Sequence, residues 1–564
     1  MVEMSQILID RGLASREQIN ELNARRALTA EKLDRMLVKE GIVEERVVLE
    51  VLSELTHLPF RHIGEFRIEP ETVQRMPART AIRFQVMPVG VSGGVITLAA
   101  YTVPSLSDAD SLRMLLDLAI EWVLCTEQDI TQTIKHFYGL GAETVDTLVG
   151  DSMVSEEVEI KGTDLSLEDT DEGVVKFVNQ IISEAIQMDA TDIHIEPFET
   201  SLRLRYRIDG LLQEIPVPQG VAHLRRAIAS CVKIMAELNI AERRKPHDGR
   251  IKVRRGRDEF DLRVSVLPST YGETVNMRIL NRKTMFIDLE HLGLTSEQLP
   301  PIEYLSALPH GVVLLTGPTG SGKTTTLYAT LARINKPNVK IITVEDPIEY
   351  QMEGISQIQT HAQIGVTFAA ALRSILRHDP DIILIGEIRD METADIAVRA
   401  SLTGHLVFST LHTNDAPSAV TRLIDMGVEP YLVSSCLEGV IAQRLVRRVC
   451  SACEEPATPE DVIIEEIRGM FPAERVQNAK FVKGHGCPTC NFTGYRGRLA
   501  LFEIMVLNDS LRSLIAHQRP SNEIKKAAME FGLTTLRKDG WGRVLNGMTT
   551  VEEVLRVARK ADLL

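Results

Sequence analysis

The sequence lacks the features that mark a membrane-spanning, a secreted or a nucleic-acid-binding protein. No run of about 18 or more apolar residues occurs in the chain, which excludes a membrane-spanning helix. Its first residues, Met-Val-Glu-Met-Ser-Gln, lack the basic region and apolar core of a secretory signal, so we expect a cytoplasmic location. The formal net charge of −15 disfavours a main role in nucleic-acid binding, because such binding neutralises phosphates.

The chain is also short of aromatic and basic residues in one internal segment. Residues 143–172 hold eleven carboxylates, a single lysine and no aromatic residue. Such a segment buries too little apolar surface to become ordered, and its like charges repel each other. We therefore predict a flexible linker here, and the 564 residues around it are too many for one hydrophobic core.

The region before this linker shows helical spacing of apolar residues up to about residue 56, as at Ile19, Leu22, Leu33 and Leu37. Strand-like segments follow at 85–91 and 94–99, so we predict a helical part and then a small α/β part, with docking as its function. After the linker, a helix over 174–188 is followed by strands at 192–196, 202–208, 212–215, 249–253 and 259–266.

A complete phosphate-binding motif, G-x-x-x-x-G-K-[ST], stands at Gly317-Pro318-Thr319-Gly320-Ser321-Gly322-Lys323-Thr324. An apolar strand over 311–315 precedes it and a helix-compatible run over 325–334 follows, which is the context this motif requires. Backbone N–H groups of the glycine-rich turn and the helix N-terminus bind phosphates. We expect Lys323 to reach the β- and γ-phosphates of ATP and Thr324 to help hold Mg²⁺.

Three further segments carry polar residues where apolar strands end. The strand 381–385 leads to Glu387, which we predict to hold Mg²⁺ through water or to orient the attacking water. The strand that begins at Ile341 leads to Glu345 and Glu349, and the strand 406–409 leads to His412, which can report the γ-phosphate. Acidic residues at strand ends are often merely solvated, and a lone histidine is more often structural.

Four of the seven cysteines form two Cys-x-x-Cys pairs, Cys450 with Cys453 and Cys487 with Cys490. Four thiolates so arranged suit a closed, tetrahedral, structural zinc site, and a pair of redox couples is the alternative. The other three cysteines, Cys125, Cys231 and Cys436, are expected in the core.

Taken in order, these motifs resemble the secretion ATPase superfamily, the motors of type II secretion and type IV pilus assembly. The resemblance covers the chain from about Gly173 to its C-terminus. It rests on the phosphate loop together with Val344–Glu349, Ile385–Asp390, Gly404–Asp415, Thr191–Pro197, Arg205–Gly210 and Ala241–Arg250.

The resemblance implies a multidomain α/β fold. A helical and α/β N-terminal domain (1–140) and the linker (141–172) would precede a PAS-like domain (173–284) and a RecA-like ATPase domain (285–448), with a zinc lobe (449–498) and a C-terminal helical domain (499–564) after them. It also implies a homohexamer whose PAS-like domain closes over nucleotide. Arginines of that domain would reach the phosphates, although each is also compatible with a surface ion pair. The candidates are Arg207, Arg250, Arg263 and Arg278.

The cysteine insert resembles that of assembly motors, since pilus-retraction members lack it, and His136–Glu143 resembles type II secretion members. We therefore expect a Mg²⁺-dependent ATPase that powers pseudopilus assembly and protein export, with pilus extension as the alternative. A platform protein and a membrane-anchored adaptor would link it to the inner membrane. Some relatives bind cyclic di-GMP through paired R-L-G triplets, but Met4–Gln6 and Lys32–Asp34 stand in those places, so we do not expect that ligand. Two alternatives belong to other functional classes: a nucleic-acid translocase, and a scaffold that binds nucleotide without hydrolysing it.

Overall fold

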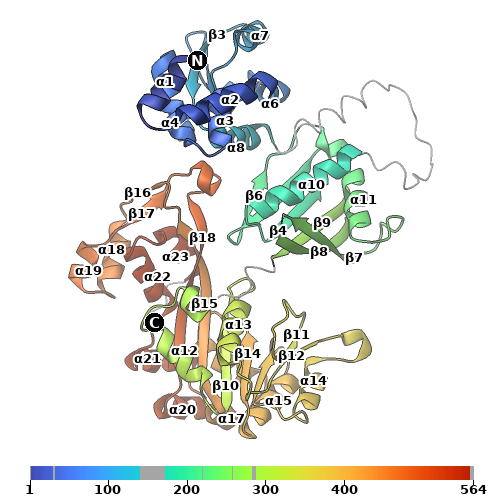
Figure 1. The fold of residues 1–564 in the computed structure, drawn as a ribbon. Helices are drawn as coiled ribbons and strands as arrows, with labels where there is room; N and C mark the ends of the chain where they lie inside the picture. The colour runs from blue at the N-terminus through green and yellow to red at the C-terminus, as the bar shows by residue number, and fades with distance from the viewer. Residues whose placement is uncertain are drawn as a thin grey trace. The chain divides into compact units, whose positions relative to one another are not determined.

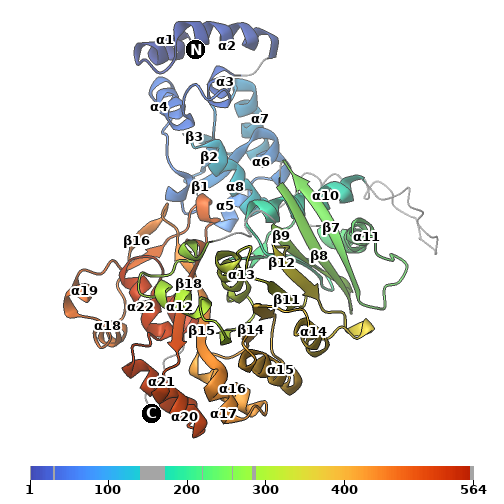
Figure 2. The same cartoon turned by 60° about the horizontal axis from the view of Figure 1, so that its bottom comes forward.

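The computed structural model describes residues 2–29, 32–139, 172–218, 220–256, 258–281 and 288–558. These residues form two compact units, one built mainly from residues 1–280 and the other mainly from residues 281–564. Figures 1 and 2 show their elements. The acidic segment predicted to be a linker lies outside the described residues, except for Glu172.

The first part of the chain is helical, as predicted. Its apolar residues Ile19, Leu22, Leu33 and Leu37 are buried in one core. Gly12 and Gly41, with φ angles of 68° and 67°, lie just beyond two helix ends, in the left-handed conformation that glycine accepts without strain. The helices are α1 (Val2–Asp10), α2 (Arg16–Thr29), α3 (Leu33–Lys39) and α4 (Glu45–Thr56).

A small α/β part follows, in which β1 (Val86–Ser92) and β2 (Val95–Ala100) confirm the two predicted strands. These two strands are antiparallel, and a third strand that the sequence did not predict, β3 (Ala119–Leu124), pairs with β2 in parallel. Four helices accompany the sheet: α5 (Pro70–Gln74), α6 (Ala78–Phe84), α7 (Leu106–Leu116) and α8 (Glu127–Tyr138).

Residues 172–281 form a six-stranded sheet with strand order β6-β5-β4-β9-β8-β7. Along β5 (Leu202–Ile208) buried apolar residues alternate with arginines, because successive side chains point to opposite faces. The apolar face packs against α10 (Glu172–Gln187) and α11 (Arg225–Met235). The other strands are β4 (Asp192–Pro197), β6 (Leu211–Ile215), β7 (His247–Arg255), β8 (Asp258–Ser269) and β9 (Gly272–Asn281), of which only β9 was not predicted.

The second unit contains a seven-stranded sheet with strand order β12-β11-β13-β14-β10-β15-β18. All neighbouring strands of this sheet are parallel except β15 and β18, which are antiparallel. The central strands are buried on both faces, which explains their uninterrupted apolar sequences. They are β10 (Gly311–Thr316), β11 (Ile341–Glu345), β12 (Ile355–Gln359), β13 (Ile382–Ile385), β14 (Leu406–Leu411), β15 (Leu437–Val449) and β18 (Tyr495–Val506).

Helices cover both faces of this sheet, as expected of a parallel sheet. Val313 and Leu315 of β10 belong to a core with residues of α12 and α13, whereas Val312 and Leu314 belong to a core with residues of the later helices. The helices up to β15 are α12 (Leu299–Ser306), α13 (Lys323–Ile334), α14 (Phe368–Ile375), α15 (Met391–Leu402), α16 (Pro417–Asp425) and α17 (Pro430–Cys436).

The segment between the two cysteine pairs carries two helices and a two-stranded sheet. Glu466 of its helix α18 (Asp461–Arg468) accepts hydrogen bonds from Arg537 and from the indole of Trp541, both on α22 (Leu536–Leu545). In the described ranges, no helix has both the length and the apolarity to cross a membrane. The remaining elements are β16 (Glu454–Pro456), α19 (Ala473–Gln477), β17 (Val482–Gly484), α20 (Asp509–Ala516), α21 (Ser521–Glu530) and α23 (Val551–Val557).

Candidate functional site

The phosphate-binding motif forms the turn between β10 and α13, as its sequence context indicates. β10 ends at Thr316 and α13 begins at Lys323, so the glycine-rich turn lies at the carboxyl end of a central parallel strand. In open α/β sheets, this edge is where ligands bind. The turn therefore holds its backbone N–H groups and a helix N-terminus at the expected ligand-binding edge.

The side chain of Lys323 folds back over this turn. Its ammonium group donates hydrogen bonds to the carbonyl oxygens of Gly317 at 2.7 Å and Pro318 at 3.0 Å. The pKa of Lys323 is lowered to about 8, mainly by burial and also by the nearby charge of Arg444, while the charge of Glu387 acts in the opposite direction. An anion bound in the turn would restore the lysine charge that burial disfavours.

Two side chains of the turn fit a phosphate and its metal ion. The Ser321 hydroxyl is buried, and within the described ranges it has no hydrogen-bond partner. Buried hydroxyls are rarely left unpaired, so this atom is suited to a ligand oxygen. Thr324 is exposed at the start of α13, where its hydroxyl is accessible to a cation. The turn thus fits a nucleotide phosphate chain with Mg²⁺.

Glu387 and His412 come from neighbouring strands and meet at the same edge. Glu387 lies two residues beyond β13, and His412 follows β14 directly, which places a ring nitrogen 3.4 Å from the Glu387 carboxylate. Arg389 pairs with this carboxylate as well. Burial favours a higher pKa for Glu387, but hydrogen bonds and charge attraction from Arg389 and His412 bring its pKa below the usual range, so the carboxylate stays ionised.

Glu345 lies at the end of β11 and is only 4% exposed. Its carboxylate accepts hydrogen bonds from Tyr328, from Thr343 at 2.6 Å and from Gln357 at 3.2 Å. Both oxygens are therefore occupied by protein donors. Glu349, four residues further, is half-buried beside Tyr350. Sequence spacing gave no sign of the network that holds Glu345.

Short contacts join the loops at this edge. The Thr410 hydroxyl donates to the carbonyl of Gly386, next to Glu387, at 2.7 Å. The hydroxyl groups of Thr316 and Thr413 are 2.7 Å apart, and the Thr413 N–H donates to Thr316 Oγ1 at 2.9 Å. The Glu387 loop, the His412 loop and the phosphate loop are therefore connected in the order of their strands.

Two residues of β15 that the sequence did not single out support the phosphate loop. Gln443 accepts a hydrogen bond from the Thr326 hydroxyl at 2.8 Å, and its backbone carbonyl would lie 2.6 Å from a Cβ atom added to Gly317. Arg444 donates to the carbonyls of Gln443 and Asn414 at 3.0 and 2.8 Å. Only the adjacency of β15 and β10 in the sheet, which sequence patterns do not reveal, could have identified these residues.

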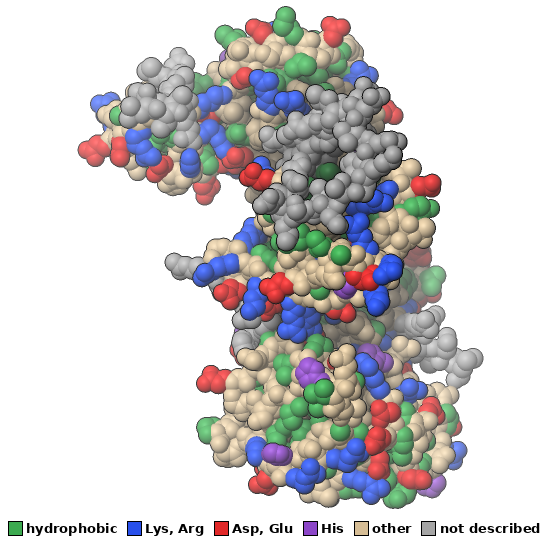
Figure 3. All heavy atoms as spheres, turned by 90° about the vertical axis from the view of Figure 1, so that its right-hand side faces the viewer, with side chains coloured by type: hydrophobic (Ala, Val, Ile, Leu, Met, Phe, Trp, Pro, Cys, Tyr) green, Lys and Arg blue, Asp and Glu red, His purple; other side chains and the backbone are tan. Residues whose placement is uncertain are grey.

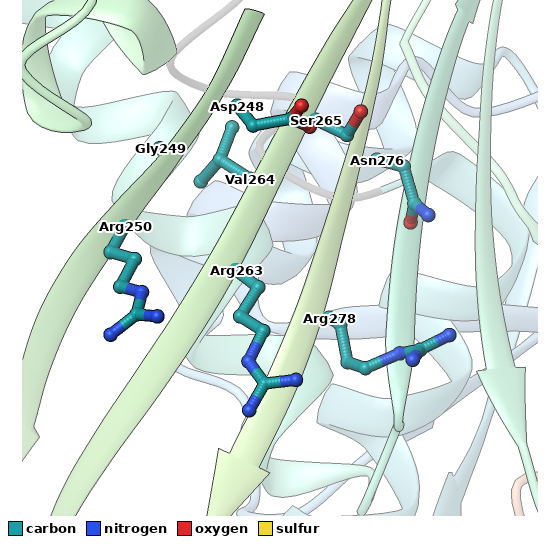
Figure 4. A pocket seen from close by; sticks show the side chains of 8 residues that line it. All are labelled: Asp248, Gly249, Arg250, Arg263, Val264, Ser265, Asn276 and Arg278. Atoms are coloured by element: carbon teal, nitrogen blue, oxygen red, sulfur yellow. The ribbon is translucent and has the colours of Figure 1, made fainter. Parts of the chain in front are cut away.

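Three of the four predicted arginines line one pocket of the first unit. Arg250, Arg263 and Arg278 come from neighbouring strands β7, β8 and β9, and Figure 4 shows their guanidinium groups in a row. The fourth, Arg207, is not among the residues that line the pocket. It lies 3.7 Å from Asp192, the carboxylate that also pairs with Arg278 at 3.1 Å.

The four cysteines of the two pairs come together as predicted, with all their sulfur atoms within 4.8 Å of one another. Cys487 and Cys490 have their sulfurs 3.8 Å apart. A tetrahedral zinc ion with Zn–S bonds of about 2.3 Å would place its ligands at about this separation. All seven cysteines are described, none forms a disulfide, and Cys125, Cys231 and Cys436 are buried as expected.

The second unit has a largely parallel sheet, a phosphate loop after a central strand and the ionised Glu387 at the same edge. These three features together define the class of phosphate-loop nucleoside triphosphatases. The chain belongs to the type II/IV secretion system protein family, whose model matches residues 167–556. It is an ATP-hydrolysing enzyme of that family. A second model, the MshEN domain, matches residues 56–144. These matches confirm the predicted family.

Similar proteins extend over nearly the whole chain. The type IV pilus assembly ATPase PilB of Myxococcus xanthus is 40% identical over 563 residues, covering 98% of each chain. The type II secretion system protein E of Xanthomonas campestris is 44% identical over 543 residues, covering 93% of each. Among solved structures, the ATPase DotB of Yersinia pseudotuberculosis matches with a TM-score of 0.51 at 19% identity, over 72% of this chain and 97% of that one, which shows a common fold.

Proposed function

We propose that this chain is a homohexameric motor that hydrolyses ATP at the cytoplasmic face of the inner membrane and powers the assembly of a type II secretion pseudopilus. The contact between Glu387 and His412 at the phosphate-loop edge is the observation that supports ATP hydrolysis in this proposal. The assignment to pseudopilus assembly is supported by the similarity to a type II secretion system protein E. Identity to the pilus assembly ATPase PilB over nearly the full length supports pilus extension as the second candidate.

In the proposed cycle, the chain's own residues divide the work at a RecA-like core. Backbone groups of residues 317–322 and the Lys323 ammonium bind the phosphates, while Thr324 holds Mg²⁺. Glu387, ionised and held by Arg389, orients the attacking water. His412, half-exposed beside Glu387, contacts the γ-phosphate and reports its loss. Glu345 supports this edge through Tyr328 and Gln357, and Glu349 stays a candidate for the same edge.

We further propose that residues 172–281 form a PAS-like module. When this module closes over the nucleotide, it would supply arginines to the phosphates. A guanidinium stabilises the charge that develops during phosphoryl transfer. Arg250, Arg263 and Arg278 are the main candidates because they line one pocket together. Arg207 is a weaker candidate because it does not line that pocket, and its guanidinium donates to the Gly210 carbonyl.

The four-cysteine cluster is proposed to hold a structural Zn²⁺ ion through Cys450, Cys453, Cys487 and Cys490. The ion would supply cross-linking of the ends of β15 and β18, between which the cluster stands in the sequence, and no catalytic chemistry. Residues 1–140 are proposed to dock on a membrane-anchored adaptor, and a platform protein would receive the mechanical work. The residues at Met4–Gln6 and Lys32–Asp34, in place of R-L-G triplets, argue against cyclic di-GMP as a ligand.

The test is the ATPase rate of the purified full-length chain with three additions: membranes carrying the secretion platform, membranes carrying a pilus platform, and DNA. Stimulation by the secretion platform alone supports the proposal, and stimulation by the pilus platform alone supports pilus extension. Stimulation by DNA alone would overturn both and indicate a translocase, which the net charge of −15 disfavours; the face seen in Figure 3 carries basic and acidic side chains alike. Absence of phosphate release under every condition would leave only a nucleotide-binding scaffold.

A further inference from the structure

Arg444 is a buried cation directly behind the phosphate loop. It is 7% exposed, and in the described part of the chain no carboxylate lies within ion-pair distance of it. Burial lowers the pKa of its guanidinium, while the charges of Glu503 and Asp415 act in the opposite direction from further away. A guanidinium rarely occupies such a place without strong acceptors, so its hydrogen bonds indicate its task.

Those hydrogen bonds cross the end of the phosphate-loop strand. In the sheet, β10 lies between β14 and β15, with Thr316 level with Leu411 on one side and Ala442 on the other. From β15, Nη2 of Arg444 reaches past β10 to the Asn414 carbonyl at 2.8 Å, two residues after His412. Nη1 donates to the Gln443 carbonyl at 3.0 Å.

The same guanidinium closes on the loop itself. A Cβ atom added to Gly317 would lie only 2.9 Å from Nη1 of Arg444. The loop backbone is therefore packed directly against the arginine, and a second tie between Thr316 and Thr413 fixes the same two loops at 2.7 Å. Two separate contacts, Arg444 with Asn414 and Thr316 with Thr413, thus hold the turn after His412 against the phosphate loop.

We infer that Arg444 is a positioning residue of the ATPase site, which holds the Thr413–Asp415 turn against Gly317 so that His412 stays aligned with a phosphate in the loop. The inference rests on the proposed role of His412. Lys323 and the backbone N–H groups of the loop are still present in a chain without Arg444, so we expect the phosphates shared by ADP and ATP still to bind. What is lost is the alignment of the group that responds to the γ-phosphate.

The experiment compares Arg444→Gln with Arg448→Gln, an exposed arginine on the same strand. Full-length proteins are assayed for kcat and KM with ATP and for the dissociation constants of ADP and ATPγS. We expect Arg444→Gln to lower kcat by about 10- to 100-fold, the range for one lost hydrogen bond to a charged group. ADP affinity should change by less than about threefold. The unmodified protein should bind ATPγS more tightly than ADP, because His412 contacts the γ-phosphate, and Arg444→Gln should lose this preference. Arg448→Gln should behave as the unmodified protein.

A merely structural role is separated by a double-mutant cycle with His412→Ala. If Arg444 acts through His412, the double variant turns over no more slowly than the slower single variant. If the two single-variant losses in kcat multiply in the double variant, or if Arg444→Gln loses ADP and ATPγS affinity equally, the inference is overturned while the ATPase proposal stays intact. If His412→Ala alone keeps full turnover, the proposed role of His412 fails and the inference with it.

Two further variants cover the case in which Arg444→Gln does not fold. Arg444→Lys keeps a positive charge but cannot donate to two separated carbonyls, so an intermediate kcat with normal ADP binding is expected. Thr316→Val removes the second tie without touching a charge and should give the same loss of preference for ATPγS. Unchanged ATPγS preference in both variants, with thermal unfolding near that of the unmodified protein, would contradict the inference.

Discussion

A ring nitrogen of His412 lies 3.4 Å from the carboxylate of Glu387, although 24 residues separate them in the chain. The contact arises because β13 and β14 are neighbouring parallel strands whose carboxyl ends release both residues on the same edge. Arg389 approaches the same carboxylate. Glu387 is therefore oriented by its contacts with both side chains.

Replacement of Glu387 by glutamine should separate binding from turnover. The amide keeps the size of the side chain but cannot accept a proton or polarise water as a carboxylate does, so we expect kcat to fall by about 10²- to 10⁴-fold. ATPγS affinity should stay within about threefold, because Lys323 and the loop are unchanged. The measurement is steady-state phosphate release beside equilibrium binding.

The matched control is Glu392→Gln, which removes a carboxylate from α15 that is 63% exposed and pairs with the surface residue Arg373. It should leave kcat unchanged. Turnover by Glu387→Gln at the rate of the unmodified protein would show that another group orients the water.

Nucleotide affinity should weaken as the pH rises through about 8. Burial lowers the pKa of Lys323 from 10.5 to about 8, so the free protein loses this positive charge above that pH. Since the protonated form binds phosphates, ADP affinity should be constant below pH 7.5 and then fall by up to about tenfold per pH unit. Isothermal titration of ADP between pH 7 and 9.5 measures it.

An arginine in the same place provides the control, because its charge does not titrate in this range. Lys323→Arg should bind ADP more weakly but with no pH dependence. A flat profile in the unmodified protein would mean that Lys323 keeps its proton to higher pH than its burial implies.

Two glycines of the phosphate loop should respond differently to alanine. At Gly317 an added Cβ would stand 2.6 Å from the Gln443 carbonyl, a backbone atom that cannot move without shifting β15. At Gly320 the φ angle is 77° but nothing lies within 4 Å. Gly317→Ala should abolish detectable ADP binding, whereas Gly320→Ala adds only the strain of a left-handed residue, about 1–2 kcal/mol.

That strain corresponds to a loss of roughly 5- to 30-fold in affinity if the whole of it falls on the bound loop. Fluorescence titration with labelled ADP distinguishes the two outcomes. Equal effects at both glycines would show that the loop conformation, rather than its packing against β15, limits binding.

Local sequence predicted this site well wherever a motif and its strand lie together. The phosphate loop, Glu387 and His412 each follow an apolar strand that the pattern identifies, and the structure confirms those strands. What the pattern cannot show is which strands are neighbours. The links between Thr316 and Thr413 and between Arg444 and Asn414 depend on β10 lying between β14 and β15, a matter of topology.

Sequence spacing also could not predict which acidic side chains at the strand ends are buried. Glu345 ends a strand and Glu387 closely follows one, so the two look alike in the sequence. Glu345 is nevertheless enclosed by Tyr328, Thr343 and Gln357, whereas Glu387 pairs with Arg389 and His412. Strand β9, with its mixture of polar residues, was not predicted although Arg278 on it was selected. The selection came from family resemblance and needed no assignment of the strand.

The cysteine cluster makes the last prediction, which concerns metal content. With four sulfurs within 4.8 Å, the purified protein should contain about one zinc ion per chain. Cys487→Ser should lose that ion and lower the midpoint of thermal unfolding, because a missing ligand opens the tetrahedral site. Cys231→Ser, at a buried thiol whose pKa is raised by burial, should keep the metal. Elemental analysis of both proteins decides the matter: metal-free unmodified protein would favour redox pairs, and full zinc in Cys487→Ser would place the ion elsewhere.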